Sequence, residues 1–127
     1  MNKKVIQKTV LIVEDEPWLA SSYQRALRAA GYVAVMVRSA DEAIVAVDDH
    51  PVDVIVLDMI LPAVNGLQLL HELRSHVDLM ALPVILCSSV QLDVGPDQRA
   101  AYGIDRVLAK ATLTPATLVK AVREASA

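Results

Sequence analysis

Polar residues that could take part in metal or phosphoryl chemistry follow four aliphatic runs in this sequence. Glu14 and Asp15 follow one run, and Asp58, Ser88 and Lys110 each follow another. Three carboxylates, one hydroxyl and one ammonium group would suit a divalent metal ion and a phosphoryl group, provided that the fold brings them together. The runs are VLIV (10–13), VIVL (54–57), VILC (84–87) and RVLA (106–109).

The runs also indicate which elements position these side chains. Near-continuous apolar runs of this length are typical of parallel strands buried on both faces, and VAVMV (33–37) adds a fifth. Helix signals, including caps at Ser39 and Thr114 and a stop at Gly31, alternate with the strands. Helices are expected at about 17–30, 39–47, 67–75, 97–102 and 115–124.

This strict alternation predicts an α/β fold with right-handed crossovers. We expect a flavodoxin-like, doubly wound, five-stranded parallel sheet of strand order 2-1-3-4-5 with five helices, forming a single domain over 1–127. In that order the first and third strands are neighbours at the switch point, where ligands bind at the carboxyl ends of strands. Asp15 and Asp58 should therefore lie close together.

Composition narrows the classes of function. The chain has 127 residues, a formal charge of −3 and 54% hydrophobic residues, so it lacks the basic footprint of a nucleic-acid-binding domain. It also lacks an apolar run near the ~18 residues that span a membrane. We expect a cytoplasmic protein without nucleic-acid or membrane contacts. Cys87 is expected in the core, and Trp18 is expected to be a partly buried packing residue.

The clustered carboxylates point to a cation. Like charges held within a few ångströms cannot all ionise cheaply without one, and Lys110 is the single ammonium expected nearby. Mg²⁺ fits because it binds through one or two carboxylates, keeps waters and accepts phosphate oxygens. The alternative is that Asp15 and Ser88 only cap helices or turns, and that Lys110 is an ordinary surface charge.

Four segments together resemble the receiver domain of two-component response regulators, and the resemblance covers the whole chain. It implies that Asp58 is the phosphoacceptor, that Ser88 is the switch hydroxyl and that Lys110 is the family's lysine. It also implies Mg²⁺ as cofactor. The metal ligands would be Asp15, Asp58 and the backbone carbonyl of Ile60, with Glu14 acting through water. The segments are VLIVEDE (10–16), DVIVLDMILPAVNGLQLL (53–70), PVILCSS (83–89) and YGIDRVLAK (102–110).

The same resemblance implies the partners. The phosphoryl donor would be a phosphohistidine on a sensor histidine kinase or a histidine phosphotransfer protein, and the signal would pass to a downstream protein by direct interaction. Such a domain is not a classical enzyme, although it would catalyse its own phosphorylation and dephosphorylation.

The chain departs from the family pattern at three places, and the first two, at Ala111 and Val107, keep a second hypothesis open. Ala111 stands where the family usually has a proline with a cis peptide bond, Val107 stands where it often has Tyr or Phe, and Gly95-Pro96 interrupts the fourth helix. The alternative is a pseudo-receiver that binds partners without phosphorylation. A phosphatase of the haloacid dehalogenase type is disfavoured, since it would need Asp two positions after Asp15, where this chain has Pro17.

Overall fold

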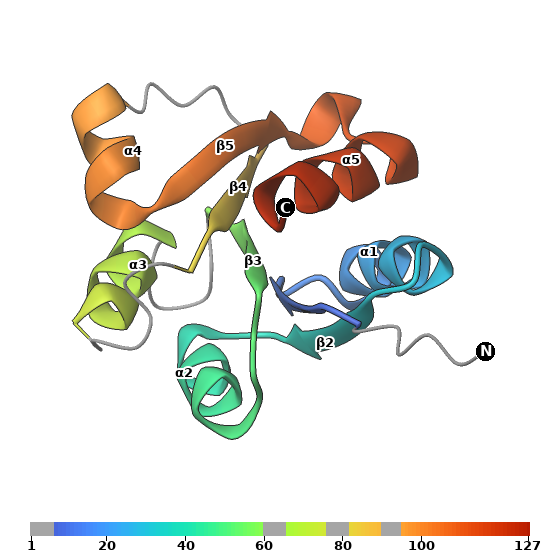
Figure 1. The fold of residues 1–127 in the computed structure, drawn as a ribbon, viewed down its shortest axis with the longest axis horizontal. Helices are drawn as coiled ribbons and strands as arrows, with labels where there is room; N and C mark the ends of the chain where they lie inside the picture. The colour runs from blue at the N-terminus through green and yellow to red at the C-terminus, as the bar shows by residue number, and fades with distance from the viewer. Residues whose placement is uncertain (1–6, 60–65, 76–81, 90–94) are drawn as a thin grey trace.

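The computed structural model describes residues 7–59, 66–75, 82–89 and 95–127, which build a twisted parallel sheet between two layers of helices (Figure 1). The strand order is β2-β1-β3-β4-β5, as predicted. All four strand pairs are parallel. The strands are β1 (Thr9–Val13), β2 (Val33–Val37), β3 (Val54–Asp58), β4 (Val84–Ser88) and β5 (Ile104–Ala109).

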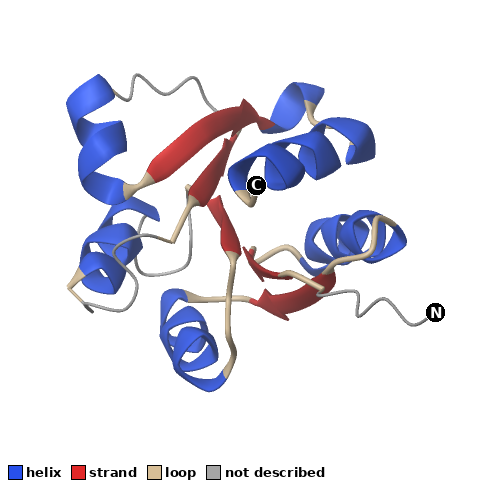
Figure 2. Ribbon diagram, viewed as in Figure 1, coloured by secondary structure: helices blue, strands red, loops and turns tan. Residues whose placement is uncertain are grey.

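Helices cover both faces of the sheet (Figure 2). The first and last helices pack on one face, and the three others pack on the opposite face. A short 3₁₀ helix, η2 (Lys110–Thr112), follows β5 directly. The α-helices are α1 (Pro17–Ala29), α2 (Ala40–Asp49), α3 (Gly66–Arg74), α4 (Pro96–Tyr102) and α5 (Pro115–Ala125). None of the described helices is both long and apolar enough to cross a membrane.

Two helix starts and the end of α1 follow the local chemistry of the sequence. The Ser39 hydroxyl accepts a hydrogen bond from the Glu42 N–H at 3.2 Å and opens α2. Thr114 and Thr117 form a reciprocal capping box at the start of α5. Gly31 follows α1 with φ 96°, a left-handed conformation that glycine adopts without strain.

Three expectations from the sequence were wrong in detail. Strand β5 begins at Ile104, before its apolar run, because it is an edge strand and its polar Arg106 side chain pairs with Asp105 and Glu124 rather than packing inside. Helix α2 continues two residues further, to Asp49. Trp18 is 68% exposed, and its indole N–H donates to Glu16 Oε2 at 2.6 Å, so it is not a packing residue.

The central strands anchor the sheet. Every residue of β3 and β4 is buried, and burying an aliphatic side chain of this size contributes roughly 1.5–3 kcal/mol. Cys87 belongs to this core as expected, and burial raises the pKa of its thiol to about 12. The carboxyl ends of β1, β3 and β4 therefore lie next to one another at the edge of a well-packed core.

Gly103 offers a test of the packing between α3 and the C-terminal end of α4. It ends α4 with φ 65° beside Arg74, whose Nε donates to the Tyr102 carbonyl oxygen at 2.9 Å. A Cβ at position 103 would clash with Nη2 of Arg74 and lie 3.0 Å from its Cζ. We expect Gly103→Ala to lower the free energy of unfolding by about 2–4 kcal/mol, through left-handed strain and displacement of the guanidinium.

The matched control is Gly31→Ala. Gly31 also has a positive φ, but a Cβ there would meet nothing within 4 Å, so only strain of about 1–2 kcal/mol is expected. Urea unfolding of both variants gives the comparison. Equal losses at the two positions would show that Arg74 does not add to the effect.

Candidate functional site

The strand register places the predicted site residues at one edge of the sheet. Val13 of β1 pairs with Leu57 of β3, so the next residues, Glu14 and Asp58, lie side by side. Asp58 pairs with Cys87 of β4, and Ser88 pairs with Ala109 at the end of β5. Lys110 follows Ala109 directly, so all four strand ends converge as the sequence predicted.

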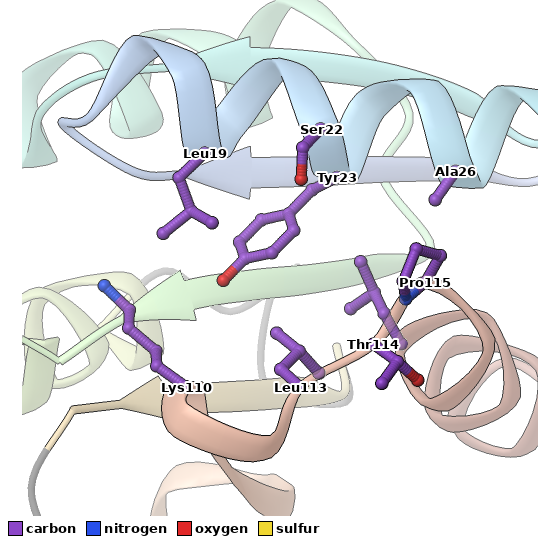
Figure 3. A pocket seen from close by; sticks show the side chains of 9 residues that line it. Leu19, Ser22, Tyr23, Ala26, Lys110, Leu113, Thr114 and Pro115 are labelled. Atoms are coloured by element: carbon purple, nitrogen blue, oxygen red, sulfur yellow. The ribbon is translucent and has the colours of Figure 1, made fainter.

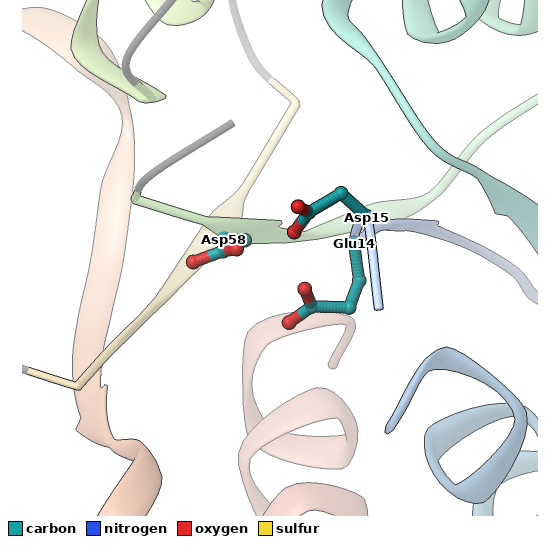
Figure 4. A group of neighbouring side chains, drawn as sticks. All are labelled: Glu14, Asp15 and Asp58. Atoms are coloured by element: carbon teal, nitrogen blue, oxygen red, sulfur yellow. The ribbon is translucent and has the colours of Figure 1, made fainter. Parts of the chain in front are cut away.

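The three carboxylates gather at this edge. One oxygen each from Glu14, Asp15 and Asp58 lies within 4.8 Å of the others. Figure 4 shows the three carboxyl groups around the end of β3, with Glu14 and Asp15 coming from the loop after β1. Glu14 is 1% exposed and Asp58 is 6% exposed, whereas Asp15 is half-buried.

Lys110 reaches into the cluster from the start of η2. Its Nζ lies 2.8 Å from Glu14 Oε1 and 3.0 Å from Asp58 Oδ1, so one ammonium bridges two carboxylates. Glu14 Oε1 is buried, and among the described residues it has no well-directed hydrogen bond besides this ion pair. The arrangement therefore has one positive charge against three acidic groups.

Burial and the neighbouring charges shift the pKa values of both Glu14 and Lys110. Burial raises the pKa of Glu14 to about 7, and the neighbouring Asp58 adds to that rise, while Lys110 and the Glu16 N–H oppose it. Burial also works against the charge of Lys110. Hydrogen bonds to Glu14 and Asp58 outweigh burial, so the pKa of Lys110 is raised and its ammonium stays charged.

Of the other residues that the sequence analysis singled out, the structure describes Ser88, Ala111 and Val107. Ser88 ends β4 at 2% exposure, next to Asp58 on the neighbouring strand. Ile60, whose backbone carbonyl was predicted to bind the metal, lies outside the described residues. The structure has no cis peptide bond in its described parts, so the bond between Lys110 and Ala111 is trans. Val107 is half-buried and packs against the core.

The donor set fits a hard divalent cation. The site consists of carboxylate oxygens whose negative charge a single lysine only partly compensates, and Mg²⁺ prefers oxygen ligands with waters completing its shell. A cation there would also offset the charge of the buried Glu14, whose Oε1 has only the ion pair with Lys110 among the described residues. Glu14, Asp15 and Asp58 would hold the ion, as their positions in the sequence suggested.

The raised pKa of Glu14 predicts a pH dependence of stability without metal. Between pH 4.5 and about 7 the folded state holds more protons on Glu14 than the unfolded state does. Its contribution to stability is therefore full below pH 4.5 and is lost as pH rises through 7. We expect metal-free protein to lose roughly 1–3 kcal/mol of unfolding free energy from this group over that range.

Urea unfolding in EDTA at pH 5 and pH 8 measures this loss. Glu14→Gln should flatten the pH dependence, and Glu72→Gln, at an exposed position on α3, should leave it unchanged. Saturating Mg²⁺ should also reduce the loss at pH 8, because it stabilises the ionised carboxylates. A Glu14→Gln variant that retains the wild-type pH dependence would contradict the assignment.

Two features of the site had no clear signal in the sequence. The depth of Glu14 and its ion pair with Lys110 could not be read from Glu14-Asp15-Glu16, which resembles a solvated acidic run. Tyr23 occupies an ordinary apolar position of α1, yet its buried hydroxyl points into a cavity beside Lys110 (Figure 3).

Comparison with known proteins relates this chain to a protein family. The response regulator receiver domain family matches residues 10–123. The polar-differentiation response regulator DivK of Brucella ovis is 31% identical over 96 residues, which cover 76% of this chain and 77% of DivK. The probable transcriptional regulatory protein TcrX of Mycobacterium tuberculosis is 42% identical over 81 residues, covering 64% of this chain. The match spans only 34% of the length of TcrX.

Solved structures have the same fold. The chemotaxis response regulator CheY4 of Vibrio cholerae superposes with a TM-score of 0.85 at 22% identity, covering 94% of this chain and 99% of CheY4. A CheY-like receiver domain from Methylobacillus flagellatus superposes with a TM-score of 0.82 at 25% identity, covering 94% and 99%. Because the family pattern matches nearly the whole chain and the fold agrees, this chain belongs to the response regulator receiver domain family.

Proposed function

We propose that Asp58 accepts a phosphoryl group in a Mg²⁺-dependent reaction. The observation that supports this most directly is the convergence at Asp58, where a buried carboxylate contacts Lys110 at 3.0 Å and lies beside two further carboxylates. A structural ion pair would need only one carboxylate. The surplus of acidic oxygens is what a divalent cation and a phosphoryl group would require.

The chain's own residues have separate roles in this reaction. A carboxylate oxygen of Asp58 attacks the phosphorus of the donor, a P–O bond forms, and the P–N bond to the donor imidazole breaks. The Lys110 ammonium neutralises charge on the phosphoryl oxygens, and the Ser88 hydroxyl donates a hydrogen bond to one of them. Bound Mg²⁺, held by Glu14, Asp15 and Asp58, would stabilise negative charge on the phosphoryl oxygens.

The proposed donor is a phosphohistidine on a sensor histidine kinase or a histidine phosphotransfer protein. The proposed output is a protein–protein interaction that depends on the phosphorylated state. The cytoplasmic location, the absence of nucleic-acid contacts and the part played by the Ile60 carbonyl stay predictions from the sequence.

The test uses wild-type protein and acetyl phosphate as a small donor. We expect phosphorylation in the presence of Mg²⁺, little in EDTA, and a modified residue that peptide mapping by mass spectrometry places at Asp58. No modification under these conditions, in a folded protein, would refute the proposal and favour the pseudo-receiver. Modification at another residue would refute the assignment of Asp58.

A further inference from the structure

A small cavity lies between α1 and α5, adjoining Lys110. Its volume is about 70 Å³, enough for at least two water molecules at the roughly 30 Å³ that each occupies in the liquid. Leu19, Leu113 and Leu118 form apolar walls, and the exposed Ser22 and Thr114 also line it. Figure 3 shows the ring of Tyr23 extending from α1 into this space with its hydroxyl foremost.

The Tyr23 hydroxyl has no partner among the residues that the structure describes. The residue is 6% exposed, and its hydroxyl makes no hydrogen bond within the part of the chain that the structure describes. Burial raises the pKa of the phenol above its ordinary value, so the hydroxyl stays protonated. A buried hydroxyl without an acceptor is unfavourable, and native proteins usually satisfy such groups with water.

Lys110 lines the same cavity with a second donor. An ammonium group has three N–H bonds, and the contacts of Lys110 with Glu14 and Asp58 account for two of them. Tyr23 and Lys110 therefore both offer a hydrogen to one partly open space. Two converging donors disfavour a cation, and the nearby Glu14 and Asp58 carboxylates disfavour an anion. A neutral molecule that accepts two hydrogen bonds fits, and water is small enough.

We propose that water in this cavity bridges the Tyr23 hydroxyl to the Lys110 ammonium, and that Tyr23 is thereby a positioning residue for Lys110. The bridge adds a further contact to Nζ besides its contacts with Glu14 and Asp58, so it limits how far the ammonium can move. Its effect on phosphoryl transfer rests on the proposed function, whereas the bridge itself does not.

The test is Tyr23→Phe, which keeps the ring and removes only the hydroxyl. If water satisfies the hydroxyl, its loss should lower the melting temperature by about 3–5 °C. A dry, unsatisfied hydroxyl gives the opposite sign, because its removal relieves a buried polar group. Tyr32→Phe is the matched control, since Tyr32 is half-buried and does not line the cavity.

Three further experiments test the link to Lys110. A crystal structure of the wild type should contain water within hydrogen-bond distance of both Tyr23 Oη and Lys110 Nζ, and Tyr23→Phe should lose it. In a double-mutant cycle, Lys110→Met should shrink the effect of Tyr23→Phe on stability. With saturating Mg²⁺, phosphorylation of Tyr23→Phe by acetyl phosphate should be about two- to tenfold slower, with an unchanged Mg²⁺ affinity by Trp18 fluorescence.

These measurements distinguish failure of the water bridge from failure of the positioning role. A higher melting temperature, or a cavity without water in the crystal, would overturn the bridge. Water without coupling to Lys110, or without a change in rate, would overturn the positioning role. If even the wild type cannot be phosphorylated, the proposed function fails. The change in melting temperature, the electron density of the water and the coupling between Tyr23 and Lys110 still decide whether the bridge exists.

Discussion

Asp58→Asn should abolish phosphorylation by acetyl phosphate in the presence of Mg²⁺. The amide is nearly the same size as the carboxylate, but its oxygen is a poor nucleophile, so the P–O bond cannot form at this position. The change also removes one of the three clustered carboxylates, so the rise in melting temperature that Mg²⁺ causes should be smaller than in wild type.

The matched control is Asp49→Asn, an exposed acidic position on α2 away from the cluster. Intact-protein mass spectrometry after incubation with the donor measures the modified fraction, and thermal unfolding with and without Mg²⁺ measures the metal effect. Asp49→Asn should match wild type in both. Undiminished modification of Asp58→Asn would show that another residue is the phosphoacceptor.

Lys110→Met should destabilise the metal-free protein and impair phosphoryl transfer. Methionine keeps much of the aliphatic stem but leaves Glu14, 1% exposed, without its cation. Breaking a buried pair typically costs about 3–5 kcal/mol, and the partial exposure of Lys110 lowers this to about 2–3 kcal/mol at pH 8. Loss of one charged donor to the phosphoryl oxygens should slow phosphorylation about 100-fold.

The pH dependence of the stability lost in Lys110→Met identifies the cause of that loss. At pH 5 Glu14 is largely protonated, because its pKa is about 7, so removal of the ammonium should cost much less than at pH 8. Lys120→Met, at an exposed position on α5, should change stability by less than about 0.5 kcal/mol at either pH. Equal losses for both lysine variants, or a loss independent of pH, would argue against the ion pair.

The amino-acid sequence by itself determined the elements of this protein and the edge at which its polar residues meet. The runs before Glu14, Asp58, Ser88 and Lys110 became β1, β3, β4 and β5, and the caps at Ser39 and Thr114 opened helices as predicted. Such features depend on residues within a few positions of one another, so they can be read from local patterns. The alternation of these elements then predicted the strand order.

Only the tertiary structure decided how the site residues are charged, paired and buried. Glu14 and Lys110 are remote in sequence, and their 2.8 Å contact, like the raised pKa of Glu14, arises because four strands end together. The exposure of Trp18 and the burial of the Tyr23 hydroxyl, which has no hydrogen-bond partner among the described residues, also depend on tertiary packing. The burial of a side chain and the strength of its electrostatic interactions depend on all the residues packed around it. Many of those residues come from distant parts of the chain.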